Sequence, residues 1–339
     1  MLTLEQIGAA QPISAPVKGD LSGKDVLSIE QFARADLEQF FEVTARMKRI
    51  VEQNGSTDIL RGKILANLFY EASTRTDASF SIAMKRLGGE VHNIVGVQFS
   101  SVSKGETLED TVRVLSGYAD VIVLRHPERG AALRATQAIH RQRQKLSLPA
   151  VPLLNAGDGV GEHPSQALLD AYTIVQKFGQ IQNITVALVG DLKHGRTVHS
   201  LAKLLSLYAQ VKLILVSPPS LQMPSELIDE LRAKNITLQE VSSISDGAAL
   251  READVWYITR VQKERFDSQE AYQEVSGSYQ VTAQTVAQMK PQAIIMHPLP
   301  RVGEISPEVD NLPQAVYFEQ AANGMYVRMA LLSGVLGKW

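Results

Sequence analysis

The stretch that decides the fold is Leu68-Phe69-Tyr70-Glu71-Ala72-Ser73-Thr74-Arg75-Thr76, in which an apolar run passes directly into a helical pattern. Ser73 and Thr74 are good N-cap residues, so the first backbone N–H groups of this helix should point outward without partners. Those donors, the hydroxyl groups and the guanidinium of Arg75 converge on one place, which suits a phosphate group. The pattern also fits ordinary capping with Arg75 in solvent, and both interpretations stay open at this point.

The same change from an apolar run to a helical pattern recurs along the chain. The runs are rich in Val, Ile or Leu without polar alternation, as in strands that are covered on both faces. The predicted strands are Lys63–Phe69, Val91–Val95, Val121–Leu124, Thr185–Val189, Leu213–Ser217, Asp254–Ile258 and Ala293–Met296. Predicted helices between them include Asp77–Arg86, Thr107–Tyr118, Ser165–Phe178 and Val198–Tyr208. This alternation predicts an α/β protein with mainly parallel sheets flanked by helices.

The length of 339 residues exceeds the usual size of one core and predicts two domains. The expected boundary is the glycine-rich stretch Asn155–Gly161, which suits a hinge or a close approach of the backbone to a ligand. Gly157, Gly159 and Gly161 do not have the spacing of a dinucleotide-binding turn, and His163-Pro164 follows where its helix should be running. A nicotinamide cofactor is therefore not expected.

The composition excludes several classes of function. Lys plus Arg (34) nearly balances Asp plus Glu (36), whereas nucleic-acid binders carry a clear basic excess. The chain has no cysteine, which rules out disulfides and thiolate chemistry. No run approaches the roughly 20 apolar residues of a membrane helix, and the segment from Met1 to Ile7 lacks the features of a signal peptide, so we expect a cytoplasmic protein. We find no metal-ligand spacing, paired acid and base or nucleophile elbow, and we expect no cofactor.

Further candidate residues follow other predicted strands. Arg125 comes just after the strand Val121–Leu124, and the carboxyl ends of strands are where open α/β sheets bind ligands. His163 and Gln166 are expected on successive exposed faces around a helix start, although a lone histidine is more often a capping or packed residue. The loop around Ser100 and Lys104 could bring a lysine to an anion, but by itself an exposed loop before a capping Thr107 is the simpler interpretation.

Three later segments each bring an arginine to the end of a predicted strand. They are Asp191–Thr197, Arg260–Arg265 and His297–Arg301. Arginines gathered at one sheet edge indicate a small ligand with carboxylates, which guanidinium groups bind in pairs of hydrogen bonds. Pro298 and Pro300 make the last segment a rigid turn. A solvated rim of charges would explain each segment alone.

Taken together and in order, these segments resemble the aspartate carbamoyltransferase family, from about Leu27 to the C-terminus. The matching segments are Ser73–Thr76, Lys104–Thr107, Arg125–Pro127, Asn155–Gly159, His163–Gln166, Val189–Leu192, Gly195–Ser200, Arg260–Arg265 and His297–Arg301. The resemblance implies a carbamoyl-phosphate-binding domain, residues 1–162 completed by a C-terminal helix at 322–339, and an aspartate-binding domain, residues 163–321. It also implies a homotrimer whose active sites are shared between subunits, and it leaves open whether regulatory or dihydroorotase subunits join.

The resemblance assigns roles residue by residue. Phosphate is held by Ser73, Thr74, Arg75, Thr76 and Arg125, with Lys104 from the neighbouring subunit. Ser100 would also reach into the neighbour's site. Thr76, Arg125 and His163 polarise the carbamoyl oxygen, while Gln166 and the backbone carbonyls near Leu299 and Pro300 orient the carbamoyl nitrogen. The carboxylates of aspartate are received by Arg196, Arg260, Gln262 and Lys104.

The implied reaction, a step of pyrimidine biosynthesis, transfers the carbamoyl group of carbamoyl phosphate to the amine of L-aspartate and needs orientation and electrostatic stabilisation rather than a covalent intermediate. Two positions depart from many relatives: Asp77 replaces an arginine, which puts phosphate affinity in doubt, and only one lysine stands near Ser103. Ornithine carbamoyltransferase is the main alternative, but its family has a cysteine where this chain has Pro298. An inactive scaffold of the same fold is a second alternative.

Overall fold

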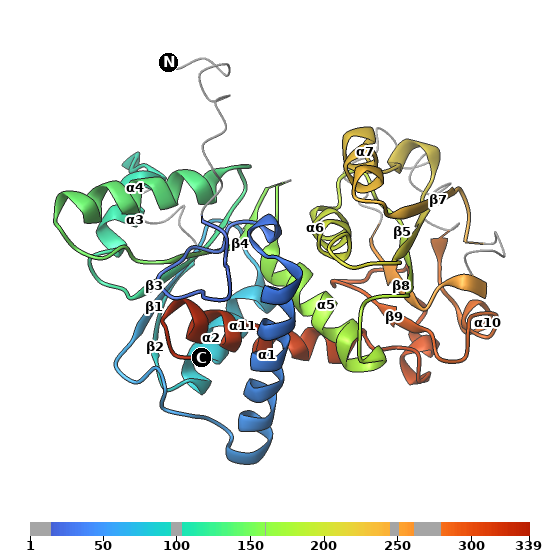
Figure 1. Cartoon of the computed structure of the whole chain (residues 1–339), viewed down its shortest axis with the longest axis horizontal. Coiled ribbons are helices and arrows are strands. Elements are labelled where there is room, and N and C mark those ends of the chain that lie inside the picture. Colours follow the sequence, from blue (N-terminus) through green and yellow to red (C-terminus); the bar gives the residue numbers. More distant parts are fainter. Residues whose placement is uncertain (1–14, 96–103, 160, 245–250, 261–278) are drawn as a thin grey trace. The chain divides into compact units, whose positions relative to one another are not determined.

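The computed structural model describes residues 15–95, 104–159, 161–244, 251–260 and 279–339. The chain divides into two compact units: unit 1 comprises residues 1–165 and 325–339, and unit 2 comprises residues 166–324. Each unit contains one parallel sheet flanked by helices (Figure 1). The predicted α/β class is therefore confirmed.

Unit 1 is built on a four-stranded parallel sheet in the order β2-β1-β3-β4. Its strands are β1 (Ile64–Phe69), β2 (Glu90–Val95), β3 (Val121–His126) and β4 (Leu153–Asp158). Its helices are α1 (Arg34–Asn54), α2 (Thr74–Arg86), α3 (Leu108–Leu115) and α4 (Ala131–Lys145), with a short 3-10 turn at Ile29–Gln31.

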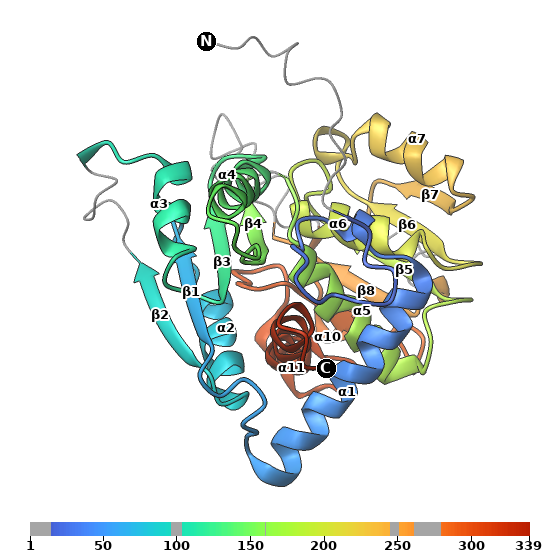
Figure 2. The same ribbon diagram turned by 60° about the vertical axis from the view of Figure 1, so that its left-hand side comes forward.

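The side chains of β1 alternate between two apolar layers, as a covered strand requires. Ala66 and Leu68 belong to a buried cluster with α3 and α4. Asn67 points to the opposite face, where its amide reaches Asp77 and Ser81 of α2. The helices on the two faces of this sheet can be followed in a second view in Figure 2.

Unit 2 is built on a five-stranded parallel sheet in the order β7-β6-β5-β8-β9. Its strands are β5 (Thr185–Val189), β6 (Lys212–Val216), β7 (Thr237–Val241), β8 (Val255–Ile258) and β9 (Ile294–Met296). Its helices are α5 (Pro164–Phe178), α6 (Arg196–Leu205), α7 (Ser225–Ala233), α10 (Ala283–Val286) and α11 (Tyr317–Val335), with 3-10 turns at Pro219–Leu221 and Pro307–Asn311. The first residues of α5 and the last part of α11 belong to unit 1.

The two faces of the second sheet are also divided by alternation along its strands. Trp256 and Ile258 pack in a buried cluster with Val286, Met289 and neighbouring residues. Tyr257 points the other way and donates to Asp170 of α5. Both faces of the interior strand β8 are thus covered, which explains its unbroken apolar sequence.

Two strands were not predicted. β7 is an edge strand of polar and apolar residues that are exposed or half-buried, so it lacks the apolar run that marked the others. β4 includes Asn155–Asp158, which the glycines had suggested as a hinge. Asn155 is nevertheless buried, because its side-chain amide donates to the Leu27 carbonyl at 3.0 Å. Close approach of the backbone is one reason for these glycines: a Cβ on Gly159 would lie 2.2 Å from the Pro127 carbonyl oxygen.

Candidate active site

The first turn of α2 forms the centre of the site in unit 1. Ser73 occupies the N-cap position but, contrary to the capping expectation, its side chain makes no capping bond. The first backbone N–H that is paired within the helix is that of Asp77, which donates to the Ser73 carbonyl at 3.0 Å. The N–H groups of Thr74, Arg75 and Thr76 precede it and are the donors that a helix start leaves available. This is the geometry in which helices bind anions.

Arg75 stands in this first turn and is exposed. Among the residues that the structure describes, no carboxylate or carbonyl is recorded as its partner. Partial desolvation lowers the pKa of its guanidinium, as expected for a cation without a compensating charge. A cation at the positive end of a helix is unfavourable by about 0.3–1 kcal/mol, so this position raises the local positive potential at a small cost in stability.

Arg125 lies at the same edge of the sheet. It is within β3, not just past it, and it is paired in register with Phe69 at the end of β1. Its guanidinium lies 3.4 Å from the Glu71 carboxylate and donates to the Ala156 carbonyl at 3.3 Å. Arg125 is thus held in place by the protein, whereas Arg75 is not.

Asp77 does not face the first turn of α2 as a free negative charge. Its carboxylate accepts a hydrogen bond from the side-chain amide of Asn67, and Ser81 lies within 3.4 Å. Asn67 is buried in β1 and also donates to Asn93 at 3.1 Å. The carboxylate is therefore committed to the sheet, while its charge still favours the start of the helix.

His163 precedes α5 and is buried, which corrects the expectation of an exposed face. Its Nδ1 lies 3.4 Å from the Ser165 hydroxyl. The preceding Glu162 fixes the backbone here, since its carboxylate accepts from the Ser28 hydroxyl at 2.8 Å and from the Ile29 N–H at 3.0 Å. Sequence reasoning missed Glu162, whose partners lie more than a hundred residues away along the chain.

In unit 2, the three arginine-containing segments start at one edge of the sheet, because they follow β5, β8 and β9, which are parallel neighbours. Arg196 is the first residue of α6, after β5, and Arg260 follows β8. The segment from His297 to Arg301 follows β9. Arg196, like Arg75, is therefore an arginine in the first turn of a helix, where the helix dipole favours a nearby anion.

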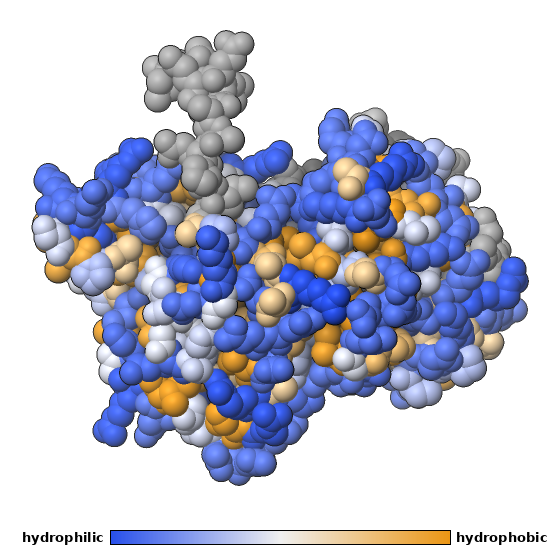
Figure 3. All heavy atoms as spheres, viewed as in Figure 1, coloured by the Kyte–Doolittle hydropathy of each residue, from blue (hydrophilic) through white to orange (hydrophobic). Residues whose placement is uncertain are grey.

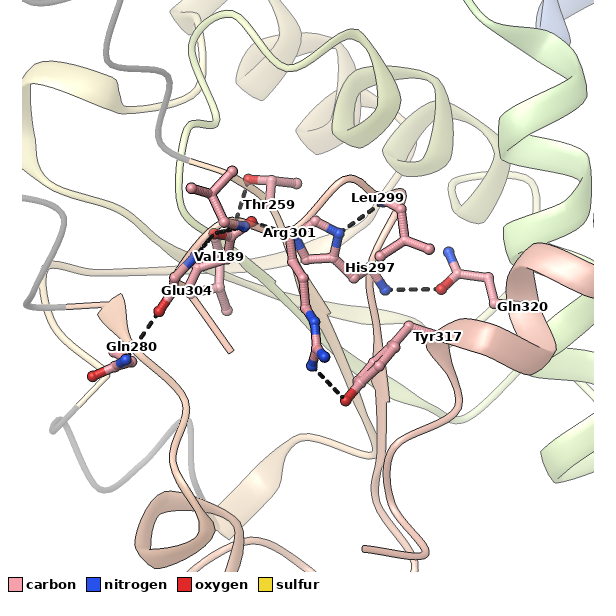
Figure 4. A network of polar contacts seen from close by, with 11 residues as sticks. Val189, Thr259, Gln280, His297, Leu299, Arg301, Glu304, Tyr317 and Gln320 are labelled. Atoms are coloured by element: carbon pink, nitrogen blue, oxygen red, sulfur yellow. Dashed lines mark hydrogen bonds and ion pairs between the residues drawn. The ribbon is translucent and has the colours of Figure 1, made fainter. Parts of the chain in front are cut away.

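The turn after β9 is held by its own side chains (Figure 4). His297 Nδ1 accepts from the Leu299 N–H at 2.7 Å, and its Nε2 lies 2.7 Å from Glu304 Oε1. Burial by itself would raise the pKa of Glu304, but hydrogen bonds from His297 and from the backbone N–H groups of Val302 and Gly303 lower it to about 2. Arg301 points away from this turn to Asp310 and Tyr317.

Gln166 lies in the first turn of α5 and donates to Asp170, one helical turn later, at 2.9 Å. Asp170 also accepts from Tyr257 and Gln320, which sequence reasoning missed. The spacing of four residues between Gln166 and Asp170 is the signal that could have shown the pair, because such residues are neighbours on a helix surface.

The remaining predicted residues are less informative. Lys104 is exposed before α3, where Thr107 caps the helix by accepting from the Asp110 N–H at 3.1 Å. Ser100 and Gln262 lie outside the described residues. Within the described ranges, no three His, Asp or Glu side chains are placed to hold a metal ion, and no helix there combines the length and apolar character needed to cross a membrane.

Parallel sheets whose carboxyl edges carry arginines at helix starts define an α/β protein built to bind small anions. Comparison with known proteins makes the class specific. Residues 24–176 match the family model described as the carbamoyl-P binding domain of aspartate/ornithine carbamoyltransferase, and residues 182–335 match its Asp/Orn binding domain. The chain belongs to the aspartate/ornithine carbamoyltransferase family.

Relatives of this chain include aspartate carbamoyltransferase catalytic subunits and longer multifunctional proteins. The aspartate carbamoyltransferase catalytic subunit of Thermococcus gammatolerans is 47% identical over 94% of this chain and 99% of its own length. The multifunctional protein pyr1-3 of Dictyostelium discoideum is 49% identical over 94% of this chain, which spans only 14% of that relative. The structure of the catalytic subunit of aspartate transcarbamoylase from M. jannaschii matches with a TM-score of 0.84 and 46% identity, covering 92% of this chain and 98% of the other.

Proposed function

We propose that this chain transfers the carbamoyl group of carbamoyl phosphate to the amine of L-aspartate, giving N-carbamoyl-L-aspartate and phosphate for pyrimidine biosynthesis. The observation that carries the proposal is the pair of guanidinium groups, Arg75 and Arg196, each set in the first turn of a helix. A cation at the positive end of a helix does not stabilise the fold by itself, and a bound anion compensates its charge.

In this proposal, unit 1 supplies the groups that bind the phosphate of carbamoyl phosphate. The available N–H groups at the start of α2, the hydroxyls of Ser73, Thr74 and Thr76, and Arg75 hold the phosphoryl oxygens. Arg125, fixed by Glu71, and His163 then stabilise negative charge on the carbamoyl oxygen. Ser100 and Lys104 are proposed to act in the site of a neighbouring subunit.

Unit 2 supplies the groups for the amine and the carboxylates. Gln166 and the carbonyls of Leu299 and Pro300 accept hydrogen bonds from the carbamoyl NH₂. Arg196, Arg260, Gln262 and Lys104 bind the carboxylates of aspartate, for which paired guanidinium hydrogen bonds are suited. The domain roles follow: carbamoyl phosphate is assigned to residues 1–162 with 322–339, and aspartate to residues 163–321.

The chemistry that these residues support is direct transfer. The uncharged amine of aspartate attacks the carbamoyl carbon, an oxyanion forms beside Arg125 and His163, and the C–O bond to phosphate breaks. Phosphate leaves with the electron pair, takes up the proton that the attacking nitrogen loses, and is stabilised by the groups that bound it. Positioning and fixed charges supply the rate enhancement, since no side chain forms a bond to the substrate.

Self-association as a homotrimer is part of the proposal. Tyr118, which follows α3, and Val114 on α3 are 71% and 52% exposed, and large apolar side chains left in water favour association. On the face drawn in Figure 3, hydrophobic residues are interspersed among hydrophilic ones. Replacing both side chains with serine should lower the mass measured by light scattering, and an unchanged mass would remove them from the interface. A cytoplasmic location stays a prediction, as does association with regulatory or dihydroorotase subunits.

The decisive experiment mixes the purified chain with carbamoyl phosphate and either L-aspartate or L-ornithine, and measures both phosphate and the carbamoyl amino acid. Turnover with aspartate alone supports the proposal. Turnover with ornithine would keep the phosphate site and overturn the choice of second substrate. Absence of turnover with both would favour an inactive scaffold, and it would leave phosphate binding by the α2 site to be measured separately.

A further inference from the structure

Asp170 is a fully buried carboxylate that the reaction itself does not use. Its Oδ1 accepts from Gln166 Nε2 at 2.9 Å and from Gln320 Nε2 at 2.6 Å, and its Oδ2 accepts from the Tyr257 hydroxyl at 2.7 Å. Burial of a charge is costly unless hydrogen-bond donors surround it, and these three donors stabilise the carboxylate. Burial, followed by the nearby charge of Asp170, raises the pKa of Tyr257 well above its usual value, which keeps this hydroxyl a donor.

The carboxylate fixes the orientation of two glutamine amides. An ionised carboxylate only accepts hydrogen bonds, so Gln166 and Gln320 must both turn their NH₂ groups toward it. The carbonyl oxygen of each amide therefore points the other way. For Gln320 this oxygen accepts from the His297 N–H at 2.8 Å (Figure 4).

Through Gln320, the same carboxylate reaches the turn after β9. The His297 backbone is held by Gln320, and the His297 ring in turn accepts from the Leu299 N–H at 2.7 Å. With Nδ1 accepting, the ring proton lies on Nε2 and is donated to Glu304. The Leu299 N–H thus forms a hydrogen bond within the turn. The backbone groups that this turn can offer to a ligand at Leu299 and Pro300 are carbonyl oxygens.

We propose that Asp170 is a positioning residue that makes this site selective for a carbonyl carrying an NH₂ group. Asp170 orients the oxygen of Gln166 directly, and it orients the Leu299 and Pro300 carbonyls through Gln320 and His297. The part of the ligand that lies against these groups therefore contacts hydrogen-bond acceptors. A substrate with NH₂ satisfies these acceptors, whereas one with a methyl group of the same shape leaves them unpaired. This inference deepens the proposed function and rests on it.

The test is the substitution Asp170→Asn in the full chain. The new amide offers an NH₂ as well as an oxygen, so a glutamine amide can turn over and show its NH₂ to the substrate. Calorimetry would measure the Kd of carbamoyl phosphate, of acetyl phosphate, which has CH₃ in place of NH₂, and of inorganic phosphate. We expect the preference for carbamoyl over acetyl phosphate to fall at least about tenfold, the loss of about one hydrogen bond, while the phosphate Kd is unchanged.

Asp254→Asn is the matched control. Asp254 lies before β8 in the same unit and accepts from the Thr185 N–H at 2.8 Å and from Lys290 at 2.6 Å. Its substitution should lower stability to urea but leave the carbamoyl-to-acetyl preference as in the unsubstituted chain. A purely structural effect of losing a hydrogen-bonded aspartate would move the preference in both variants and would overturn the proposal.

Gln320→Met decides the matter if Asp170→Asn does not fold. It removes the link to His297 but leaves Gln166 on Asp170, so a smaller drop in preference is expected. If the folded variants keep the preference for carbamoyl over acetyl phosphate while the unsubstituted chain is active, the role of Asp170 is overturned and the proposed function stands. An unsubstituted chain that transfers no carbamoyl group to aspartate would instead overturn the proposed function.

Discussion

Arg75→Ala should separate function from stability more cleanly than any other change in the candidate site. The side chain is exposed, and no partner is recorded for it among the described residues, so its loss should change the free energy of unfolding by less than about 0.5 kcal/mol. In the proposed complex it makes a charge-assisted pair of hydrogen bonds with phosphate, worth about 3 kcal/mol. That energy corresponds to about a hundredfold in phosphate Kd and in kcat/KM.

The assay combines calorimetric titration of inorganic phosphate with initial rates and urea unfolding. Arg86→Ala is the matched control, because Arg86 lies in the last turn of the same helix and donates to the Gly55 carbonyl. That variant should lose about 1 kcal/mol of stability and keep its phosphate Kd. Near-normal kcat/KM and phosphate Kd in Arg75→Ala would show that the anion is bound elsewhere and would refute the reasoning from the helix start.

Three further predictions concern stability. Hydrogen bonding to buried Asp25 raises the pKa of His140 above its usual value near 6.5. The pair therefore stabilises the fold fully below about pH 6.5, and this stabilisation is lost as pH rises through the raised pKa. Urea midpoints measured from pH 6 to 9 should fall over this range, and His140→Gln should abolish the fall. The pKa of Glu304 is lowered to about 2, so this carboxylate adds stability above about pH 4.3 that is lost as pH falls toward 2. In Glu304→Gln the urea midpoint should depend less on pH between these values. An equal dependence would count against the pairing of Glu304 with His297. Thr107→Ala should cost about 1 kcal/mol in urea unfolding and Thr107→Ser much less, whereas equal losses would mean that the cap bond to Asp110 is not what stabilises α3.

The sequence predicts the central strands well because each is an apolar run covered on both faces. The predicted strand Thr185–Val189 is β5 residue for residue, and the other predicted strands match observed ones within two residues at either end. Edge positions are harder, because an edge strand such as β7 needs no apolar run. β4 was missed for another reason: Asn155 and Gly157 suggest a loop, and only the contact of Asn155 with Leu27 makes them compatible with a buried strand.

The site shows the same division between local and distant signals. Arg75, Arg196 and Arg260 were located from local pattern, since each follows a predicted strand, and the structure places them at the carboxyl edges of the sheets. The residues that orient the site could not be located in this way. Gln320 reaches Asp170 from 150 residues away, and such a pairing is set by the fold rather than by any nearby residue.

Unit 1 is discontinuous in sequence: it consists of residues 1–165 and 325–339, and all of unit 2 lies between them in the chain. The second piece completes the first: the Gly23 N–H donates to the Val335 carbonyl at 2.9 Å, and the ring of Trp339 lies 6.4 Å from that of Phe40. Domains usually fold in the order in which they leave the ribosome. Here unit 1 cannot be complete until residues 325–339 have been made, so unit 2 can fold before it. A chain that stopped after residue 324 would have a complete unit 2, but the apolar residues of unit 1 that pack against residues 325–339 would be exposed to water.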